Sequence, residues 1–146
     1  MIKLSTKGRY GSRLMLNLAS HYVDGKEPVI LKRISEEEDI SIRYLEQIII
    51  SLKIRKLVKS IRGASGGYIL SKHPSEINLK EIIEAAEGPI CLVDCVDDND
   101  FCYRIPNCAT YEIWKTASLM LENCFEKISL QDLVKILNKK KRKDKL

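Results

Sequence analysis

Three cysteines share one short stretch of the chain at a spacing that suits metal or redox chemistry. Cys95, Cys102 and Cys108 have six and five residues between neighbours, and four of the five cysteines fall within residues 91–108. Thiolate sulfur is a preferred ligand of zinc and of iron-sulfur clusters. The sequence therefore predicts a metal or redox centre whose ligands include Cys95, Cys102 and Cys108.

The spacing alone leaves the chemistry of this centre open. The chain has neither a C-x-x-C pair nor an H-x-x-x-H motif, which would indicate a zinc ribbon or finger. Zinc and a thiol that senses oxidants are both alternatives to an iron-sulfur cluster. The fourth ligand is unassigned, with Cys91, the nearby aspartates and an N-terminal side chain as candidates. Cys124 falls on an apolar helix face and is expected in the core. His21 and His73 suit ordinary surface roles.

A second group of polar residues has the chemistry to read DNA. Ser41 is suited to cap a helix whose apolar residues recur every three or four positions, which leaves Arg43, Tyr44, Glu46 and Gln47 off the apolar stripe. Glutamine can bond adenine, glutamate can accept from cytosine, and arginine can reach guanine or phosphate. A plain solvent-exposed face is the alternative reading of this helix.

The residues that follow favour the DNA-binding reading. Two short strand patterns flank the glycine-rich stretch 62–67, which predicts a β-hairpin, and Arg62 at its start could enter a minor groove. Between residues 40 and 72 there are seven basic side chains against one acid, Glu46. A helix pair joined by a tight turn and followed by such a hairpin is the layout of a winged helix-turn-helix.

The elements that must position these residues follow from apolar periodicity and from breaks at glycine and proline. The expected fold is mainly α with a small β-hairpin, a winged helix-turn-helix followed by a long dimerisation helix. The expected elements are helices at 6–23, 31–38 and from 41, strands near 58–61 and 68–70, a helix at 79–87, an irregular loop at 91–108, a helix at 109–126, and a last helix from Ser129 through Leu137.

Charge divides the 146-residue chain into three regions. Residues 1–75 hold 14 Lys/Arg and 7 Asp/Glu, residues 76–138 hold 5 and 12, and residues 139–146 hold 6 and 1, for net charges of +7, −7 and +5. We predict a DNA-binding domain over 1–75, a unit of connecting helix, cysteine loop, dimerisation helix and C-terminal helix over 76–138, and a disordered basic tail over 139–146.

Several classes of protein are disfavoured. The glycine-rich stretch lacks the Lys-Ser/Thr pair of a phosphate-binding loop and leads into another strand. No nucleophile, base and orienting acid stand out, so an enzyme is not expected. Apolar runs are too short for a membrane span, and the first residues lack a secretory signal, so we expect a cytoplasmic protein.

The sequence resembles a family, the IscR, CymR and NsrR group of bacterial winged-helix transcription regulators. The resemblance covers about residues 1–137 and includes Trp114 and five motifs: LSTKGRY at 4–10, YLEQ at 44–47, LVKSIRG at 57–63, GGY at 66–68 and EGP at 87–89. It implies a homodimer, paired through the long helix, on a near-palindromic duplex operator. Ser41, Tyr44, Glu46, Gln47 and Arg62 then occupy DNA-contacting positions.

The resemblance also implies a cofactor. Cys95, Cys102 and Cys108 look like the three cysteines that hold an iron-sulfur cluster in sensing members, of the 2Fe-2S type with 4Fe-4S as the alternative. The implied function is a cluster-sensing repressor of genes for cluster assembly or related redox and iron functions. The alternative is a zinc-bound or thiol-based repressor of redox or cysteine metabolism.

The chain departs from the family pattern at several positions. Arg43 stands where the cluster regulator has serine, Asp39 replaces a turn glycine, and the gap after Cys95 is one residue longer than usual. Tyr111 stands where the IscR-type histidine ligand would lie, and Arg9 stands at the NsrR aspartate position. The fourth ligand therefore stays unassigned in the resemblance as well.

Overall fold

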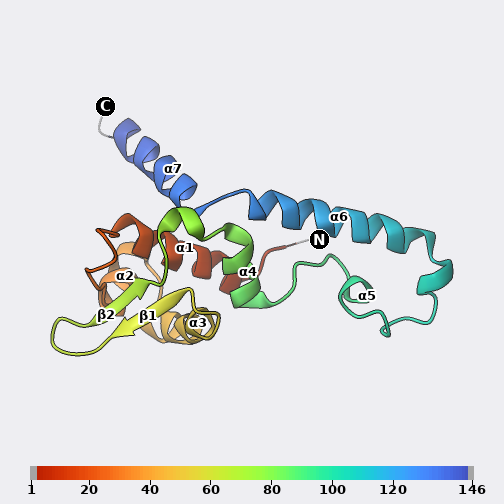
Figure 1. The fold of residues 1–146 in the computed structure, drawn as a ribbon, viewed down its shortest axis with the longest axis horizontal. Coiled ribbons are helices and arrows are strands. Elements are labelled where there is room, and N and C mark those ends of the chain that lie inside the picture. The colour runs from red at the N-terminus through yellow and green to blue at the C-terminus, as the bar shows by residue number, and fades with distance from the viewer. Residues whose placement is uncertain (1–2, 145–146) are drawn as a thin grey trace.

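The protein is mainly helical, with one small antiparallel sheet (Figure 1). The structure is a computed structural model that describes residues 3–144. Its elements are α1 Thr6–Ser20, α2 Leu31–Glu38, α3 Ile42–Ile54, β1 Val58–Ile61, β2 Gly67–Leu70, the 3-10 turn η1 Pro74–Glu76, α4 Leu79–Glu87, α5 Asp94–Asp97, the 3-10 turn η2 Ile105–Asn107, α6 Ala109–Glu126 and α7 Leu130–Lys143. The predicted fold class is confirmed. None of the described helices is long and apolar enough to cross a bilayer.

Helix α1 is the element around which the first half packs. The Ser5 hydroxyl caps it by accepting the N–H of Gly8 at 3.2 Å, and α1 contacts α2, α3, α4 and α7. Its apolar residues Leu14 and Met15 are fully buried. The helix ends at Ser20, three residues before the predicted end, because the chain turns at His21, where the Tyr22 N–H donates to the Ala19 carbonyl at 3.2 Å. Asp24 enters a left-handed conformation with φ of 50° only after this turn.

Helices α2 and α3 are joined by the tight turn that the sequence predicts. Asp39 ends α2 in the left-handed region at φ 51°, a conformation that aspartate tolerates better than most residues. Ser41 then caps α3 by accepting the N–H of Tyr44 at 3.3 Å. The apolar stripe of α3 is buried at 0–3% exposure: Leu45, Ile48, Ile49 and Leu52. This stripe fixes which face of α3 points outward.

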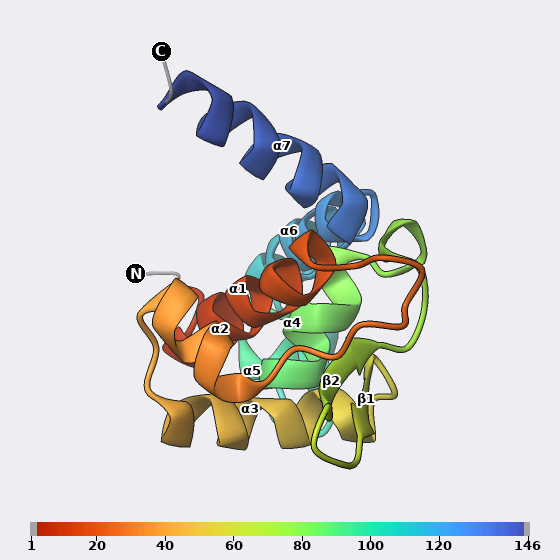
Figure 2. The same cartoon turned by 90° about the vertical axis from the view of Figure 1, so that its left-hand side faces the viewer.

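The two strands form the predicted hairpin beside the C-terminal end of α3 (Figure 2). Val58 pairs with Leu70 at one end of the ladder, and the isolated residue Val29 exchanges two backbone hydrogen bonds of 2.9 Å with Tyr68 on the other side of β2. Gly67 has φ of 151°, and a Cβ there would lie 2.7 Å from the Val29 backbone. Glycine at this position is what lets the third strand segment approach the hairpin.

Residues after 75, the predicted end of the DNA-binding domain, share the hydrophobic core of residues 3–75. Ile77, Ile82 and Leu130 are fully buried in the same cluster as the residues of α1 and α3. A capping box formed by Asn78 and Glu81 starts α4, and the Leu130 N–H donates to the Ile77 carbonyl at 2.8 Å, which ties the start of α7 to this core. The fold therefore has no break in packing at residue 75.

The second half also differs from three sequence expectations. Residues 91–108 are not wholly irregular, because the Asp98 N–H closes the single turn of α5 on Asp94 at 2.9 Å and Pro106 lies in η2. Cys124 is exposed rather than buried, because the described residues do not cover the face of α6 that carries it. Within residues 3–144, α6 buries only Tyr111 and Ser118.

The predicted disordered tail is the third difference. Residues 139–143 continue α7 as helix to Lys143, while Lys145 and Leu146 lie outside the described residues. A capping box of Ser129 and Asp132 starts the helix, lysine and arginine are good helix formers, and cations at a helix C-terminus are favoured by the helix dipole. Figure 2 shows α7 standing out from the molecule.

Candidate DNA interface and cysteine loop

The outward face of α3 carries four of the predicted DNA-contacting residues. Arg43, Glu46 and Gln47 are exposed, and Ser41 is exposed at the N-terminus of the helix, where its hydroxyl serves as the cap. None of them lies on the buried stripe, so the packing of α3 leaves their polar groups to solvent. This face offers an arginine, a glutamate and a glutamine to base edges or phosphates.

Tyr44, the fifth predicted residue of α3, is placed differently. Its ring is half-buried and packs edge-on against Tyr10 of α1, with 5.6 Å between ring centroids. The guanidinium groups of Arg9 and Arg13 lie 5.8 and 5.5 Å from the centroid of the Tyr10 ring. Tyr44 therefore links α3 to the aromatic ring and the two arginines of α1, and only part of its own surface faces solvent. Sequence reasoning did not single out Tyr10, although an aromatic residue near the start of α1 is a signal for such packing.

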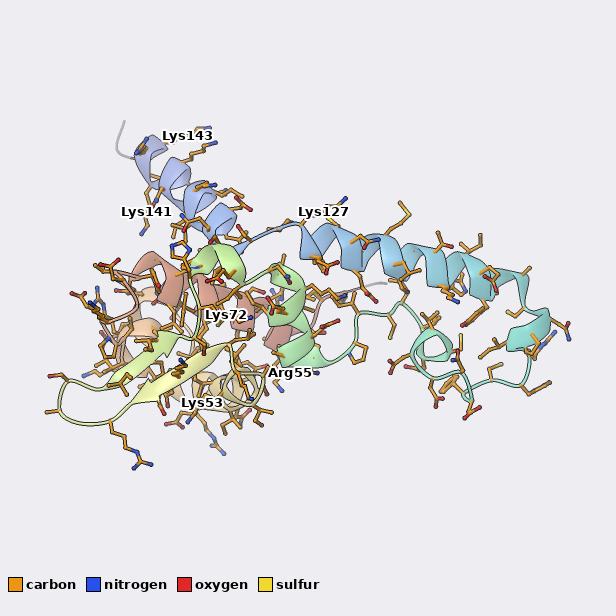
Figure 3. All side chains as sticks on the ribbon, in the orientation of Figure 1. Lys53, Arg55, Lys72, Lys127, Lys141 and Lys143 are labelled. Carbon is orange, nitrogen blue, oxygen red and sulfur yellow. The ribbon has the colours of Figure 1, made fainter. Side chains whose placement is uncertain are left out.

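The hairpin and the end of α3 add positive charge beside this face. Arg62 is exposed in the turn that follows β1, where the Gly66 N–H donates to the Gly63 carbonyl at 3.0 Å. Lys53 and Arg55 are exposed at the C-terminal end of α3 (Figure 3). Lys72 lies nearby, although its ammonium is 3.4 Å from the Glu81 carboxylate. The combination is suited to phosphate contact.

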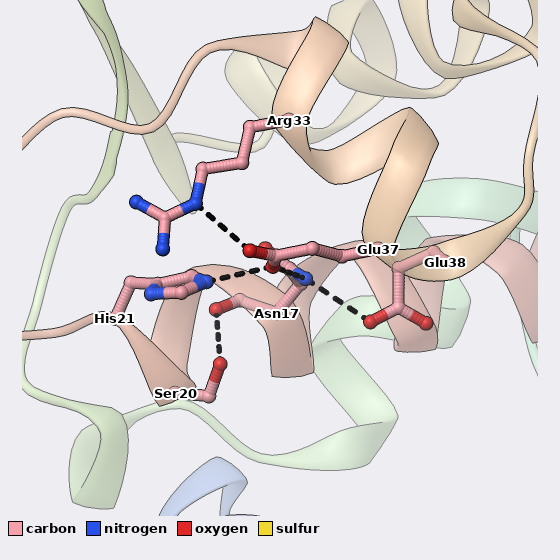
Figure 4. Close-up of polar contacts among 6 residues, drawn as sticks. All are labelled: Asn17, Ser20, His21, Arg33, Glu37 and Glu38. Carbon is pink, nitrogen blue, oxygen red and sulfur yellow. Dashed lines mark hydrogen bonds and ion pairs between the residues drawn. The ribbon is translucent and has the colours of Figure 1, made fainter.

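A polar network fastens α2 to α1 (Figure 4). The amide of Asn17, which is 4% exposed, donates to Glu37 at 2.8 Å and to Glu38 at 3.1 Å, and its Oδ1 has no hydrogen-bond partner within residues 3–144. His21 Nε2 lies 2.7 Å from Glu37, and Arg33 donates to the same carboxylate at 2.8 Å. His21, expected to have an ordinary surface role, is thus a structural contact. The network sets the position of α2.

The same network shifts the pKa of Glu37. Partial burial raises the pKa, but hydrogen bonds from His21, Arg33 and Asn17 outweigh it and hold the pKa of Glu37 at about 2, against an ordinary 4.5. The carboxylate therefore stays charged at any pH the protein meets in a cell.

His73, the other histidine with an expected surface role, is also a structural contact, because its ring accepts the N–H of Ser75 at the start of η1.

The three predicted metal ligands lie on three different pieces of one loop, which we define as the cysteine loop, residues 91–108. Cys95 is in α5, Cys102 is in the turn before η2, and Cys108 is the residue before α6; all three are half-buried. Within residues 3–144, no three histidine, cysteine, aspartate or glutamate side chains are grouped closely enough to hold a metal ion. The described arrangement does not bring the three thiols together.

Two thiols of this region have shifted pKa values, in opposite directions. Hydrogen bonds from Thr110, whose hydroxyl is 3.3 Å from the sulfur, and from the Tyr111 N–H lower the pKa of Cys108. Burial, reinforced by Asp97 and other nearby acids, raises the pKa of Cys91. Thiolate is the form that binds metals and reacts with oxidants. Cys108 is therefore the better prepared of the two for either role.

Two side chains of α6 hold the cysteine loop. The Leu92 N–H donates to the buried hydroxyl of Ser118 at 3.0 Å, and the Tyr111 hydroxyl donates to the Asn99 amide oxygen at 3.3 Å. Cys95 lies between these two attachment points. Sequence reasoning missed Ser118 and Asn99 and treated Tyr111 only as a residue at a ligand position, because single hydrogen bonds between a loop and a helix leave no pattern in sequence.

The donor set of the loop fits a thiophilic metal centre in its chemistry. Three thiols on one segment suit zinc or an iron-sulfur cluster, and hydrogen bonds from Thr110 and from the Tyr111 N–H lower the pKa of the Cys108 thiol. Neither α5 nor η2 buries a residue, so little packing opposes movement of the loop. Tyr111 is 7% exposed and has its hydroxyl bonded to Asn99, so it is not presented as a fourth ligand.

Helix α6 has an apolar face that no other part of residues 3–144 covers. Its exposed large apolar side chains include Ile113 at 61%, Trp114 at 40% and Met120 at 68%. In Figure 1 α6 extends lengthwise along one side of the molecule, and it contacts α4. An apolar face of this kind is typical of an interaction surface.

Comparison with known proteins gives a consistent answer. A model of the Rrf2 family, described as "Iron-dependent Transcriptional regulator", matches residues 4–136. The HTH-type transcriptional regulator CymR of Bacillus subtilis is 38% identical over 132 residues, which is 90% of this chain and 89% of CymR. IscR of Photorhabdus laumondii is 38% identical over 133 residues, 91% of this chain and 79% of IscR.

Solved structures agree with the sequence comparisons. CymR of B. subtilis, the global cysteine regulator of that organism, superposes with a TM-score of 0.76 at 38% identity, over 93% of this chain and 98% of its own. IscR of T. potens superposes with a TM-score of 0.75 at 38% identity, over 93% and 88% of the two chains. These relatives are transcription regulators, not enzymes, and share the DNA-binding winged-helix fold. The chain described here therefore belongs to the Rrf2 family of transcription regulators.

Proposed function

We propose that this protein is a repressor that senses an iron-sulfur cluster, of the 2Fe-2S type with 4Fe-4S as the alternative, and controls genes of cluster assembly or of related redox and iron functions. The observation that carries the proposal is the cysteine loop. It places Cys95, Cys102 and Cys108 on one segment that is weakly packed and is attached directly to α6. The IscR relatives and the description of the family model support the choice of iron.

Different residues would hold the cluster and connect the cysteine loop to the rest of the protein. Cys95, Cys102 and Cys108 would hold the cluster, and when bound the cluster would supply a centre sensitive to oxygen and to iron supply. Ser118 and Tyr111 hold the loop on α6, while Ser5, at the start of α1, donates from its N–H and hydroxyl to Glu87 at 3.1 and 2.7 Å. Glu87 ends α4 just before the cysteine loop, so the loop is connected to α1 by both chain and hydrogen bonds.

Anaerobic reconstitution with iron and sulfide tests the cluster. The proposal expects visible absorbance and stoichiometric iron and sulfide in the wild type, and loss of both in Cys95→Ser, Cys102→Ser and Cys108→Ser. Cys124→Ser is the matched control, because Cys124 is exposed on α6 outside the loop and should leave the spectrum unchanged. A colourless, iron-free wild type after reconstitution rejects the cluster.

A second function is favoured by two specific observations. The thiols are not grouped around a metal position in residues 3–144, and the pKa of Cys108 is lowered by Thr110, which suits a reactive thiol. The relatives named CymR include the global cysteine regulator. The second candidate is therefore the zinc-bound or thiol-based repressor of redox or cysteine metabolism, and these two observations favour its thiol-based, metal-free form. Bound zinc, or a disulfide that forms reversibly in a metal-free and fully active repressor, would favour it.

We also propose that the protein works as a homodimer in the cytoplasm, paired through the exposed apolar face of α6, on a near-palindromic duplex operator. Two copies of α3 in such a dimer read half-sites about 34 Å apart, one helical turn of DNA or a multiple of it. Met120→Glu should give a monomer in sedimentation, because it places charge in the pairing face. Val23→Glu, at an apolar position 58% exposed outside α6, is the control and should stay dimeric. A monomeric wild type contradicts this proposal.

The exposed face of α3 with Ser41, Arg43, Glu46 and Gln47, which we call the reading face, supports a set of proposed roles on the operator. We propose that Arg43, Glu46 and Gln47 reach base edges, that Ser41 and Tyr44 contact the adjacent backbone, and that Arg62 enters a minor groove. Footprints of the reconstituted and stripped protein should differ on a shared set of promoters. Identical footprints would contradict sensing by the cluster, while leaving DNA binding in place.

A further inference from the structure

We propose that the C-terminal half of α7 is a second site for the phosphate backbone of duplex DNA, on the opposite side of the protein from α3. The relevant segment is residues 138–143, which we call the basic arm. In Figures 1 and 2, which differ by a quarter turn, α3 lies on one side of α1 and α7 projects from the other. The two positively charged regions therefore face different directions.

The first half of α7 packs against the hydrophobic core, and the second half projects into solvent. Leu130 is fully buried, and Leu133 and Val134 pack against the core. From Asn138 to Asp144 every residue is exposed. The anchored turns hold the basic arm at a defined place, because a continuous helix connects the two.

The basic arm carries positive charge on all sides. Residues 139–143 are five consecutive cations, and five successive positions go more than once around a helix. The ion pairs described within residues 3–144 include Lys135 with Asp132 in α7 but none for the cations of the basic arm. Like charges four residues apart, such as Lys139 and Lys143, repel each other. A bound polyanion would relieve this repulsion.

The composition of the basic arm favours a nucleic acid over a protein or a membrane. Residues 138–144 contain no apolar or aromatic side chain, and protein interfaces depend on such anchors. A helix that lies on a membrane also needs an apolar face. Within residues 3–144, Ile136, at 50% exposure, is the single large apolar side chain of α7 that is exposed. Lysines act as point charges for phosphate. Duplex DNA is the phosphate polymer that regulators of this family bind.

Because α3 and the basic arm face opposite ways, one straight duplex does not reach both. The protein would hold its operator against α3 and a second duplex, or a distant part of the same DNA, against the basic arm. This inference depends on membership of a DNA-binding family and not on the proposed cluster. A failed reconstitution would therefore reject the cluster alone, and a failed bridging assay would reject the second DNA site alone.

A bridging assay tests the inference on the full-length protein. A duplex enriched by the wild type from a random-sequence pool is fixed to beads, saturated with protein and exposed to a fluorescent duplex of unrelated sequence. The variant with Lys139, Lys140, Lys141, Arg142 and Lys143 changed to Gln should capture the second duplex at least tenfold less, and its operator affinity should stay within about twofold of the wild type. Glutamine keeps the helix propensity of these positions.

The matched control changes the four lysines of the basic arm to arginine, which keeps the charge and should keep the capture. Capture by the wild type should also fall steeply as salt rises, because phosphate contacts release counterions. Equal capture by the glutamine variant overturns the inference. So does a parallel loss of operator affinity, which would place the basic arm on the operator itself, or preferential capture of a single-stranded RNA.

Discussion

The reading face and the cysteine loop are held in place by different means. Arg43, Glu46 and Gln47 stand on a helix whose other face is fully buried, so their backbone moves only if the core opens. Cys95 and Cys102 stand on a segment whose short helices bury no residue and which two side-chain hydrogen bonds attach to α6. A rigid candidate DNA-reading face is therefore joined to a deformable candidate sensor.

The largest expected effect is in the core beneath the reading face. Ile48→Ala removes a fully buried side chain of α3 and should lower the free energy of unfolding by about 2–5 kcal/mol, with operator binding lost at the same denaturant concentration. Urea denaturation followed by circular dichroism measures this. Ile50→Ala, at a position 58% exposed on the same helix, and Phe101→Ala, 61% exposed on the cysteine loop, should change stability by less than about 0.5 kcal/mol. Equal losses at Ile48 and Phe101 would remove the contrast between the two regions.

The next effect separates DNA contact from sensing. Arg62→Ala should weaken operator binding about tenfold, or about 1.4 kcal/mol, because it removes an exposed cation beside the reading helix. Gel-shift titration at several salt concentrations measures the loss. Arg104→Ala removes an exposed arginine from the cysteine loop and should leave operator affinity unchanged. A similar loss in both variants would mean that the loop also touches DNA.

A smaller effect concerns the network between α1 and α2. The pKa of Glu37 is about 2 in the folded protein against 4.5, so the stability it contributes is complete above about pH 4.5 and is lost as the pH falls through 2. Because the side chain is 36% exposed and screened by solvent, we expect about 1 kcal/mol. Urea denaturation at pH 5 and pH 3 should show a smaller drop for Glu37→Gln than for the wild type. Glu36→Gln, at an exposed neighbouring position, should behave as wild type.

The smallest effect tests how weakly the loop is held. Tyr111→Phe removes the hydrogen bond to Asn99 and should raise the alkylation rate of Cys95 and Cys102 in the metal-free protein about threefold, since one such bond contributes about 0.5–1 kcal/mol. Mass spectrometry of alkylated peptides measures the rates. Tyr103→Phe, 92% exposed on the same loop, is the control. Unchanged rates in Tyr111→Phe would show that this bond does not restrain the thiols.

The packed half was predictable because its signals are local and repeated. The apolar stripe of α3, the cap at Ser41 and the left-handed turn at Asp39 each follow from the preferences of single residues, and they agree with one another. The end of α1 was placed three residues late, since the stopping residues Asp24 and Gly25 act only after the chain has already turned.

The second half was less predictable because its structure depends on what does or does not pack on it. Its helical position predicts that Cys124 is in a core, but nothing in the described part of the chain covers the face that carries it. Residues 139–143 were assigned to a disordered tail from their charge, but the helix that starts at Leu130 continues through them. Periodicity identifies an apolar face without saying what covers it.

The sequence by itself determined the winged-helix layout, the exposure of Arg43, Glu46, Gln47 and Arg62, and the gathering of the cysteines in one loop, because these follow from spacing along the chain. Only the tertiary structure decided that Tyr44 packs against Tyr10, that Ser118 and Tyr111 hold the loop, and that α7 points away from α3. Contacts between residues far apart in sequence depend on the relative placement of whole elements, which no local pattern records.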